Sequence, residues 1–181
     1  MPKYLRKLGR SGRWLPGPGD FVDEKPAQKF PPTALRDFEN DEGNVSVWLV
    51  DDELKNLDQI LAAIATTRNS SGDVDYVLLE EATIKEELGL EVRVDQGETK
   101  DERANGWHRN IAIRSSGDLE GLADKIWRAP KTRRREGAVL NLLVDGIDEG
   151  RFREDQLAES LAKHVRECRS RRRTSRETDG Q

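Results

Sequence analysis

The stretch VSVWLV, residues 45–50, decides the fold. Its β-branched and aromatic side chains follow one another with little alternation, which is typical of a strand that is buried on both faces. Asp51 and Asp52 come directly after it and can cap a helix. In that expected helix, one apolar stripe consists of Leu54, Leu57, Leu61 and Ile64. These residues are three, four and three positions apart, so they lie on the same side of a helix. A buried strand therefore leads into an amphipathic helix.

A second strand is expected at VDYVLLE, residues 74–80, after a turn rich in serine and glycine. A strand, a helix and a strand joined by short links form a crossover unit, so we expect the two strands to be parallel neighbours with a right-handed connection. Beyond them, Thr83 and Glu86 stand at capping-box spacing, which predicts a short helix that Gly89 ends.

Two later segments alternate apolar and polar residues, which is typical of strands with one solvent-exposed face. LEVRVD at 90–95 and HRNIAIR at 108–114 are expected to pair as an antiparallel hairpin around the long polar loop Gln96–Trp107. A helix over 118–127, begun by Ser116 or Asp118, completes the unit. The predicted fold class is α/β, with α+β as the alternative: a small mixed sheet with a β-α-β crossover, an antiparallel hairpin and flanking helices.

The domain organisation follows from where prolines and apolar residues concentrate. Six of the seven prolines lie before residue 33, which favours an extended arm whose aromatic residues, Trp14, Phe21, Phe30 and Phe38, dock it on the core. AVLNLLV at 138–144 favours a buried strand over a helix, and a helix is expected over 154–169. The expected parts are a Pro-rich arm with a basic start at 1–44, an α/β core at 45–128, a basic linker at 129–137, a strand–helix addition at 138–169 and a disordered basic tail at 170–181.

Composition and charge restrict the function classes. Charged residues make up 36% of the chain, and the single cysteine excludes an internal disulfide. Neither a signal peptide nor a transmembrane helix is recognisable, so we expect a cytoplasmic protein without membrane contact. The first fourteen residues carry five basic and no acidic side chains, and the last nineteen carry seven basic and three acidic ones, whereas the net charge of the whole chain is −4. An acidic body with basic ends favours a role in association.

His108 is the weak catalytic candidate, because it lies beside Trp107, Arg109 and Asn110 at the mouth of the polar loop. An imidazole next to a guanidinium and an amide could support acid–base chemistry or anion binding. The alternative is that Trp107 covers the core while His108 and Arg109 alternate out of a strand. Since no nucleophile–base arrangement is recognisable around His108, we lean toward a protein without enzymatic activity, and no cofactor is predicted.

One set of carboxylates is a candidate for metal binding. Asp51, Asp52 and Glu80 end the two strands that are expected to be parallel neighbours, where acidic residues can hold Mg²⁺. Capping of the following helix explains Asp51 and Asp52 equally well. Two histidines and one cysteine give no zinc site of the usual spacing, and the sequence contains no GxxxxGK[ST] phosphate loop.

Basic residues form the remaining candidate surface. They suit phosphate contact, and interleaved aromatic residues suit base stacking, yet the basic ends could instead fold back on the acidic body. The residues expected to contact a protein or nucleic acid are Lys3, Arg6, Lys7, Arg10, Arg13, Trp14, Lys131, Arg133, Arg134, Arg135, Arg171, Arg172 and Arg173.

The expected function is a cytoplasmic, non-catalytic adaptor or accessory subunit that binds a larger protein partner through its arm, long loop and basic tail. A nucleic-acid-binding accessory protein that uses the basic ends is one alternative. A metal-assisted enzyme with carboxylates at its strand ends is the other. The oligomeric state does not follow from these patterns.

Overall fold

The computed structural model describes residues 2–9, 14, 21–22, 25–26, 32–38 and 43–178. The chain divides into two compact units, each assembled from segments that are far apart in the sequence. Unit 1 consists of Met1–Glu53, Asp75–Asp95 and His108–Thr132, and unit 2 consists of Leu54–Val74, Gln96–Trp107 and Arg133–Gln181. Neither unit coincides with the contiguous parts expected from the sequence.

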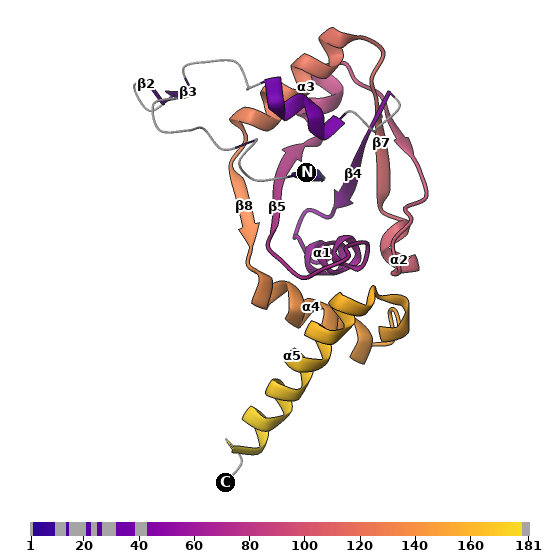
Figure 1. The fold of residues 1–181 in the computed structure, drawn as a ribbon. Helices are drawn as coiled ribbons and strands as arrows, with labels where there is room; N and C mark the ends of the chain where they lie inside the picture. Colours follow the sequence, from indigo (N-terminus) through magenta and orange to yellow (C-terminus); the bar gives the residue numbers. More distant parts are fainter. Residues whose placement is uncertain are drawn as a thin grey trace. The chain divides into compact units, whose positions relative to one another are not determined.

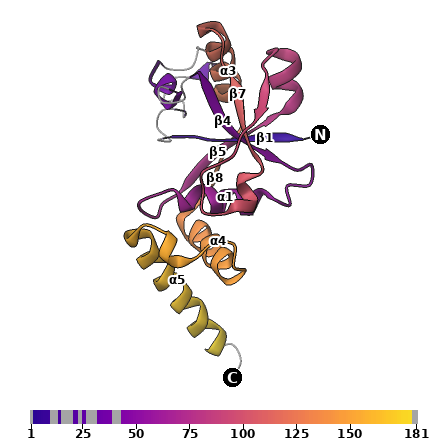
Figure 2. The same ribbon diagram turned by 90° about the vertical axis from the view of Figure 1, so that its right-hand side faces the viewer.

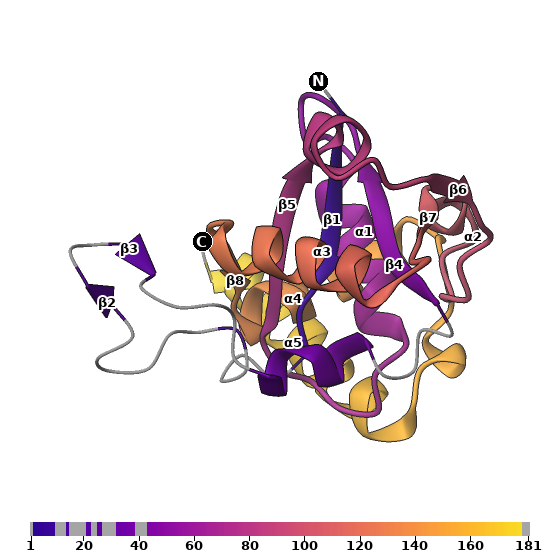
Figure 3. The same ribbon diagram turned by 90° about the horizontal axis from the view of Figure 1, so that it is seen from above.

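A six-stranded sheet forms the framework, in the order β6-β7-β4-β1-β5-β8 (Figure 3). β1 pairs antiparallel with β4 and with β5, and β7 pairs antiparallel with β4 and with β6. The mixed α/β fold and the β6–β7 hairpin are therefore confirmed. The strands are β1 (Lys3–Lys7), β4 (Asn44–Val50), β5 (Val74–Glu80), β6 (Val92–Val94), β7 (His108–Ala112) and β8 (Lys131–Arg134), and a separate small ribbon pairs β2 (Phe21–Val22) with β3 (Lys25–Pro26).

β1 comes from the segment that the sequence predicts to be an arm, and it lies between β4 and β5. Lys3 is opposite Val50 on one side and Glu80 on the other. Because β1 is antiparallel to both neighbours, β4 and β5 run in the same direction, as the crossover predicts, but they do not touch as neighbouring strands. The sequence KYLRK does not predict a buried strand, because three of its five residues are basic. In the structure, however, Leu5 at its centre is completely buried.

Arg6 can lie in a central strand because both terminal nitrogens of its guanidinium donate hydrogen bonds. Nη1 donates to the backbone oxygen of Ser46 and Nη2 to that of Asp37, each at 2.9 Å, and the guanidinium lies 5.2 Å from the centre of the Phe38 ring. Such bonds compensate for the loss of water around a buried cation. Asp37 and Phe38 belong to the short 3-10 helix η2 (Pro32–Phe38), so Arg6 ties this helix to the sheet.

Aromatic docking of the N-terminal segment is confirmed for two of its four rings. Trp14 is almost completely buried and meets Phe38 edge to face, with 5.7 Å between the ring centres. Asp37 accepts hydrogen bonds from the Trp14 indole Nε1 and from the backbone nitrogen of Gly9. Phe30 and the side chain of Phe21 lie outside the described part of the structure.

Helix α3 (Ser116–Arg128) covers one face of the sheet in unit 1 (Figure 3). The expected apolar face is confirmed, since Leu122, Ala123 and Ile126 are all fully buried in the core of this unit. The cap is one residue earlier than predicted: Ser115 Oγ accepts from the backbone nitrogen of Asp118 at 3.1 Å. Ser115 takes this role because its backbone is extended, as an N-cap requires.

A single π-helical turn, η3 (Thr83–Glu87), stands where the short helix was predicted. Gly89 ends it with φ +61°, a conformation that glycine adopts at little cost. The predicted capping box is wrong, because Ala82 occupies the N-cap position without a side-chain cap bond, and Thr83 Oγ1 donates to Glu87 Oε1.

Unit 2 is helical and contains α1 (Leu57–Thr66), α2 (Glu102–Asn105), α4 (Glu136–Asp148), η4 (Glu154–Gln156) and α5 (Glu159–Thr178). α4 packs between α1 and α5 (Figures 1 and 2). α1 begins later than predicted, with Asn56 and not Asp51 or Asp52 at the N-cap position. Leu54 has φ +58° and is exposed, so it does not belong to the apolar stripe.

Three predictions in the last third of the chain are wrong. AVLNLLV lies within α4, because Val139, Leu140, Leu143 and Val144 share one buried helical face. The linker contains β8. The basic tail continues α5 through Thr178; within this helix Arg169 pairs with Asp148 and Arg172 with Asp145 of α4, which neutralises charge that would otherwise favour disorder.

The central position of β1 predicts which N-terminal substitutions destabilise the protein. Leu5→Ala removes a fully buried side chain and is expected to lower the free energy of unfolding by about 2–5 kcal/mol. Lys3→Ala, which breaks a half-exposed ion pair with Glu80, is expected to cost less than about 1 kcal/mol. Urea unfolding followed by tryptophan fluorescence measures both, and equally small losses would contradict a central β1.

Candidate interaction site

The β6–β7 hairpin presents an open sheet edge. β6 is the terminal strand on its side of the sheet. The Glu91 oxygen accepts from Ala112 N at 2.9 Å, and Asp95 N donates to the His108 oxygen at 3.4 Å. In an antiparallel pair, backbone groups of alternate residues face alternate sides. The N–H and C=O groups of Val92 and Val94 therefore point away from β7, where the described part of the chain provides no strand.

The side chains of β6 divide between the two faces of the sheet. Val92 packs on the apolar core beneath α3, whereas Val94, on the same face, is 80% exposed. The opposite face carries Glu91, Arg93 and Asp95, and Arg93 Nη2 lies 2.7 Å from Glu91 Oε2. An exposed valine beside unpaired backbone groups is unusual, because edges are normally protected by charged or bulged residues. Among the large hydrophobic side chains of the described ranges, only Leu54 is also exposed, at 38%.

His108 lies on the charged face of the hairpin and is nearly buried. Its ring meets Trp48 edge to face, with 5.0 Å between the ring centres, and its Nδ1 lies 3.3 Å from Asp95 Oδ2 without hydrogen-bond alignment. Asn110 Nδ2 also donates to Asp95 Oδ2, at 2.8 Å. Burial lowers the pKa of His108, which Asp95 partly offsets and Arg109 reinforces. The imidazole thus packs against Trp48 of β4 and lies beside Asp95, the residue that follows β6.

The other residues at the loop mouth have different contacts. Arg109 Nη1 donates to the His108 oxygen at 2.7 Å, and Trp107 is half-buried with the Arg103 guanidinium 5.9 Å from its ring centre. The loop itself is ordered by Asp101, a buried carboxylate that caps α2 through Ala104 N and accepts from Gln59 Nε2. Arg151 lies 3.5 Å from the same carboxylate. These contacts give the loop a structural role within unit 2.

The carboxylates proposed for a metal do not converge. Lys3, opposite both Val50 and Glu80, places its ammonium 3.0 Å from Glu80 Oε1, so a cation of the protein already neutralises this strand end. Asp51 is half-buried and Asp52 is exposed. Across the described residues, no group of three His, Cys, Asp or Glu side chains is placed to hold a metal ion.

Most of the basic residues predicted to contact a partner are engaged within the chain. Arg134 lies 2.5 Å from Asp58, and Arg172 lies 2.8 Å from Asp145. Carboxylates, backbone oxygens or other groups of the chain likewise engage Lys3, Arg6, Lys7, Lys131, Arg133, Arg135 and Arg171. Trp14 is buried, Arg173 is exposed, and Arg10 and Arg13 lie outside the described residues.

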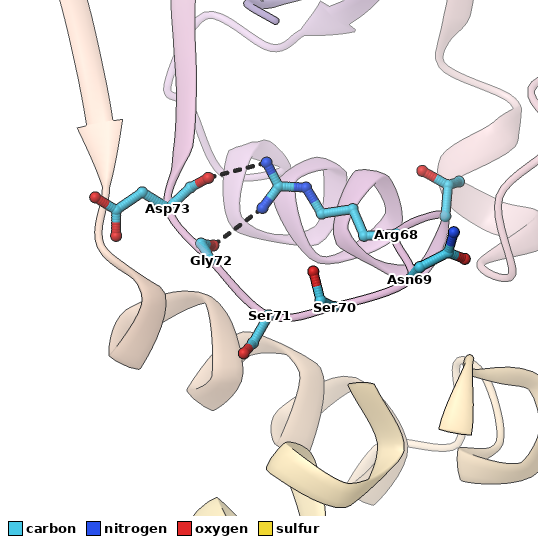
Figure 4. A pocket seen from close by; sticks show the side chains of 7 residues that line it. Arg68, Asn69, Ser70, Ser71, Gly72 and Asp73 are labelled. Carbon is cyan, nitrogen blue, oxygen red and sulfur yellow. Dashed lines mark hydrogen bonds between the residues drawn. The ribbon is translucent and has the colours of Figure 1, made fainter. Parts of the chain in front are cut away.

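A polar hollow is formed by the loop at residues 67–73 in unit 2 (Figure 4). The Arg68 guanidinium closes the loop by donating to the backbone oxygens of Gly72 and Asp73, at 3.0 and 2.9 Å. The Asp73 carboxylate accepts from the backbone nitrogen of Glu136 at 2.8 Å. It thereby caps α4, whose own N-cap residue, Arg135, supplies no side-chain bond. These contacts account for the loop as a helix anchor.

Lys131 lies in an unusual environment for a basic residue, because its ammonium group is half-buried against Trp127. Its ammonium donates to the backbone oxygen of Trp127, near the end of α3, and lies 5.3 Å from the centre of the Trp127 ring. No carboxylate in the described part of the chain is paired with it. Burial lowers the pKa of Lys131 to about 8. By contrast, Lys85 is exposed and paired with Glu81, whose carboxylate raises the pKa of Lys85.

No protein-family model matches the chain, and comparisons with curated proteins and with solved structures find no match either. In the described ranges, no helix is both long enough and apolar enough to cross a bilayer. The free edge at Val92 and Val94 was not singled out by sequence reasoning. The alternation Glu91–Val92–Arg93–Val94–Asp95 predicts a strand, but the position of this strand at the edge of the sheet follows only from the strand order.

The environment of His108 predicts its titration. Because burial disfavours the imidazolium, the folded pKa lies below 6.5, so His108 contributes to stability fully above pH 6.5 and loses this contribution as the pH falls through the lowered pKa. NMR of a His164→Gln variant, which leaves one imidazole, measures the midpoint. Asp95→Asn is expected to lower it further, since Asp95 favours the charged ring. A midpoint at or above 6.5 would show that burial does not dominate.

The environment of Lys131 predicts selective acylation. With a pKa near 8, about half of the Lys131 amines are uncharged at pH 8, whereas the salt-bridged Lys85 remains almost entirely protonated. Brief treatment with acetic anhydride over a pH series, followed by peptide mass spectrometry, should give half-maximal labelling of Lys131 near pH 8. If Lys131 labels with the same pH profile as Lys85, its amine is not desolvated as described.

Proposed function

We propose that this protein is a non-catalytic accessory protein that recognises a protein partner by strand addition at the free edge of β6. The observation that carries the proposal is the combination of outward-facing backbone groups at Val92 and Val94 with the 80% exposure of the Val94 side chain. An extended segment can hydrogen-bond to such an edge while its side chains meet those of the edge strand. The contact that we propose lies at the hairpin and not at the arm, loop or tail.

The environment of the basic residues supports this choice over nucleic-acid binding. Binding to a phosphate backbone draws its free energy from basic side chains that release counterions. Here Arg134, Arg169 and Arg172 are neutralised by carboxylates of the same unit, so binding a nucleic acid would first require these ion pairs to open. The placement of Lys3 beside Glu80 likewise argues against a metal-assisted reaction at that strand end.

A pull-down from native extract tests the proposal with a matched pair of variants. Val94→Pro removes the outward N–H without affecting a bond to β7, whereas Val94→Thr keeps that N–H and the β-branched shape. We expect specific partners to be retained by the wild type and by Val94→Thr, and to be reduced about tenfold or more by Val94→Pro.

Nuclease treatment and a high-salt wash distinguish the nucleic-acid alternative. Partners held by strand addition should survive both, because backbone hydrogen bonds and apolar contact do not depend on counterion release. Partners that are lost on nuclease treatment, or that bind Val94→Pro as well as the wild type, would contradict the proposal.

A further inference from the structure

We infer that the strand which occupies the free edge of β6 is β6 of a second copy of this chain, paired antiparallel about a two-fold axis at Val94. The inference rests on the proposed function and names its partner. Two copies related by a two-fold axis present the same edge to each other, so the edge must complement itself. The sequence Glu91–Val92–Arg93–Val94–Asp95 can do so in only one register.

Backbone geometry limits the possible registers to three. Only residues whose N–H and C=O groups point outward can exchange hydrogen bonds with the second copy, and in β6 these are Val92 and Val94. The two-fold axis can therefore pass Val92, Arg93 or Val94. In each case the two copies remain antiparallel, and the side chains of Glu91, Arg93 and Asp95 meet on one face.

Two of these registers are unfavourable. An axis at Arg93 sets Arg93 opposite its own copy and Glu91 opposite Asp95, so like charges face each other on both sides of the axis. An axis at Val92 sets Leu90 opposite Val94 of the second copy. Leu90 cannot pair there, because it is buried and its N–H already donates to the Ile84 oxygen at 3.0 Å.

The axis at Val94 avoids both problems. It sets Arg93 opposite Asp95 of the second copy twice, once on each side of the axis, so opposite charges meet. Arg93 then lies between that carboxylate and Glu91 of its own strand, 2.7 Å away. On the other face the two Val94 side chains, each 80% exposed in the single chain, cover one another. The register thus accounts for both the charge order and the exposed valine.

The dimer is expected to be weak and concentration-dependent. A short edge strand buries far less than the roughly 800 Å² per partner of a standard interface. Analytical ultracentrifugation of the purified full chain from about 10 µM to 1 mM covers the corresponding range of dissociation constants. Val94→Pro removes the two central N–H donors, one per copy, and should weaken dimerisation about 30-fold, whereas Val94→Thr should dimerise like the wild type.

Charge exchange tests the register. In a dimer of Arg93→Asp, the introduced carboxylate faces Asp95 of the other copy, and in a dimer of Asp95→Arg, the introduced guanidinium faces Arg93 of the other copy. Each variant alone should therefore remain monomeric. An equimolar mixture of the two variants restores both opposite-charge pairs and should form a heterodimer, which native mass spectrometry detects by its mass. Circular dichroism measures whether each variant is folded. If Asp95→Arg unfolds because Asn110 and His108 lose their contact with Asp95, the comparison of Val94→Pro with Val94→Thr still tests the dimer.

The outcomes separate this inference from the proposed function. A wild-type protein that stays monomeric up to about 1 mM, or a dimer that Val94→Pro leaves intact, overturns the inference, as does an Asp95→Arg variant that dimerises alone. A monomer whose extract partners are nevertheless lost in Val94→Pro overturns the second copy as the occupant and leaves strand addition to a different protein standing. A dimer with the expected variant pattern supports both.

Discussion

The sheet depends on one buried strand that carries three basic residues. β1 supplies the hydrogen bonds that join β4 to β5, and nothing else in the described part of unit 1 lies between those two strands. Its place is secured by Arg6, which satisfies backbone oxygens on β4 and on η2 at once. Because a buried guanidinium without such partners would be strongly destabilising, the position of η2 and the position of β1 determine each other.

Sequence patterns predicted elements well where one physical signal dominated. VSVWLV and VDYVLLE are strands over almost the expected residues, and the apolar face of α3 is as its spacing indicates. β1 was missed because its polar residues are satisfied by contacts that are distant in sequence. AVLNLLV was mistaken for a strand because a seven-residue apolar run is too short to show the helical spacing of Val139, Leu140, Leu143 and Val144. α5 exceeded its predicted length because acidic residues of α4, and not solvent, neutralise its arginines.

The candidate sites were harder to predict than the elements, because they depend on which charges meet. Composition indicates an acidic body with basic ends, but local sequence could not show that Asp58, Asp73 and Asp145 would pair with arginines from distant segments. His108 was recognised as a singular residue, while its environment against Trp48 and Asp95 required the register of three strands. The free edge of β6 followed only from the strand order, since an edge position is a property of the sheet and not of the strand.

The central place of β1 also affects how the chain acquires its structure. Lys3 meets Val50 and Glu80, so a strand that is translated before both of its neighbours must wait for partners that are synthesised many residues later. Contacts this distant close slowly, since the intervening chain loses conformational freedom before any pairing compensates for it. During translation, the β4 segment therefore emerges before its sheet can be completed, and its apolar residues are exposed in that interval to chaperones and to aggregation. The order of synthesis, and not only the stability of the finished sheet, therefore affects how β1 and β4 come together.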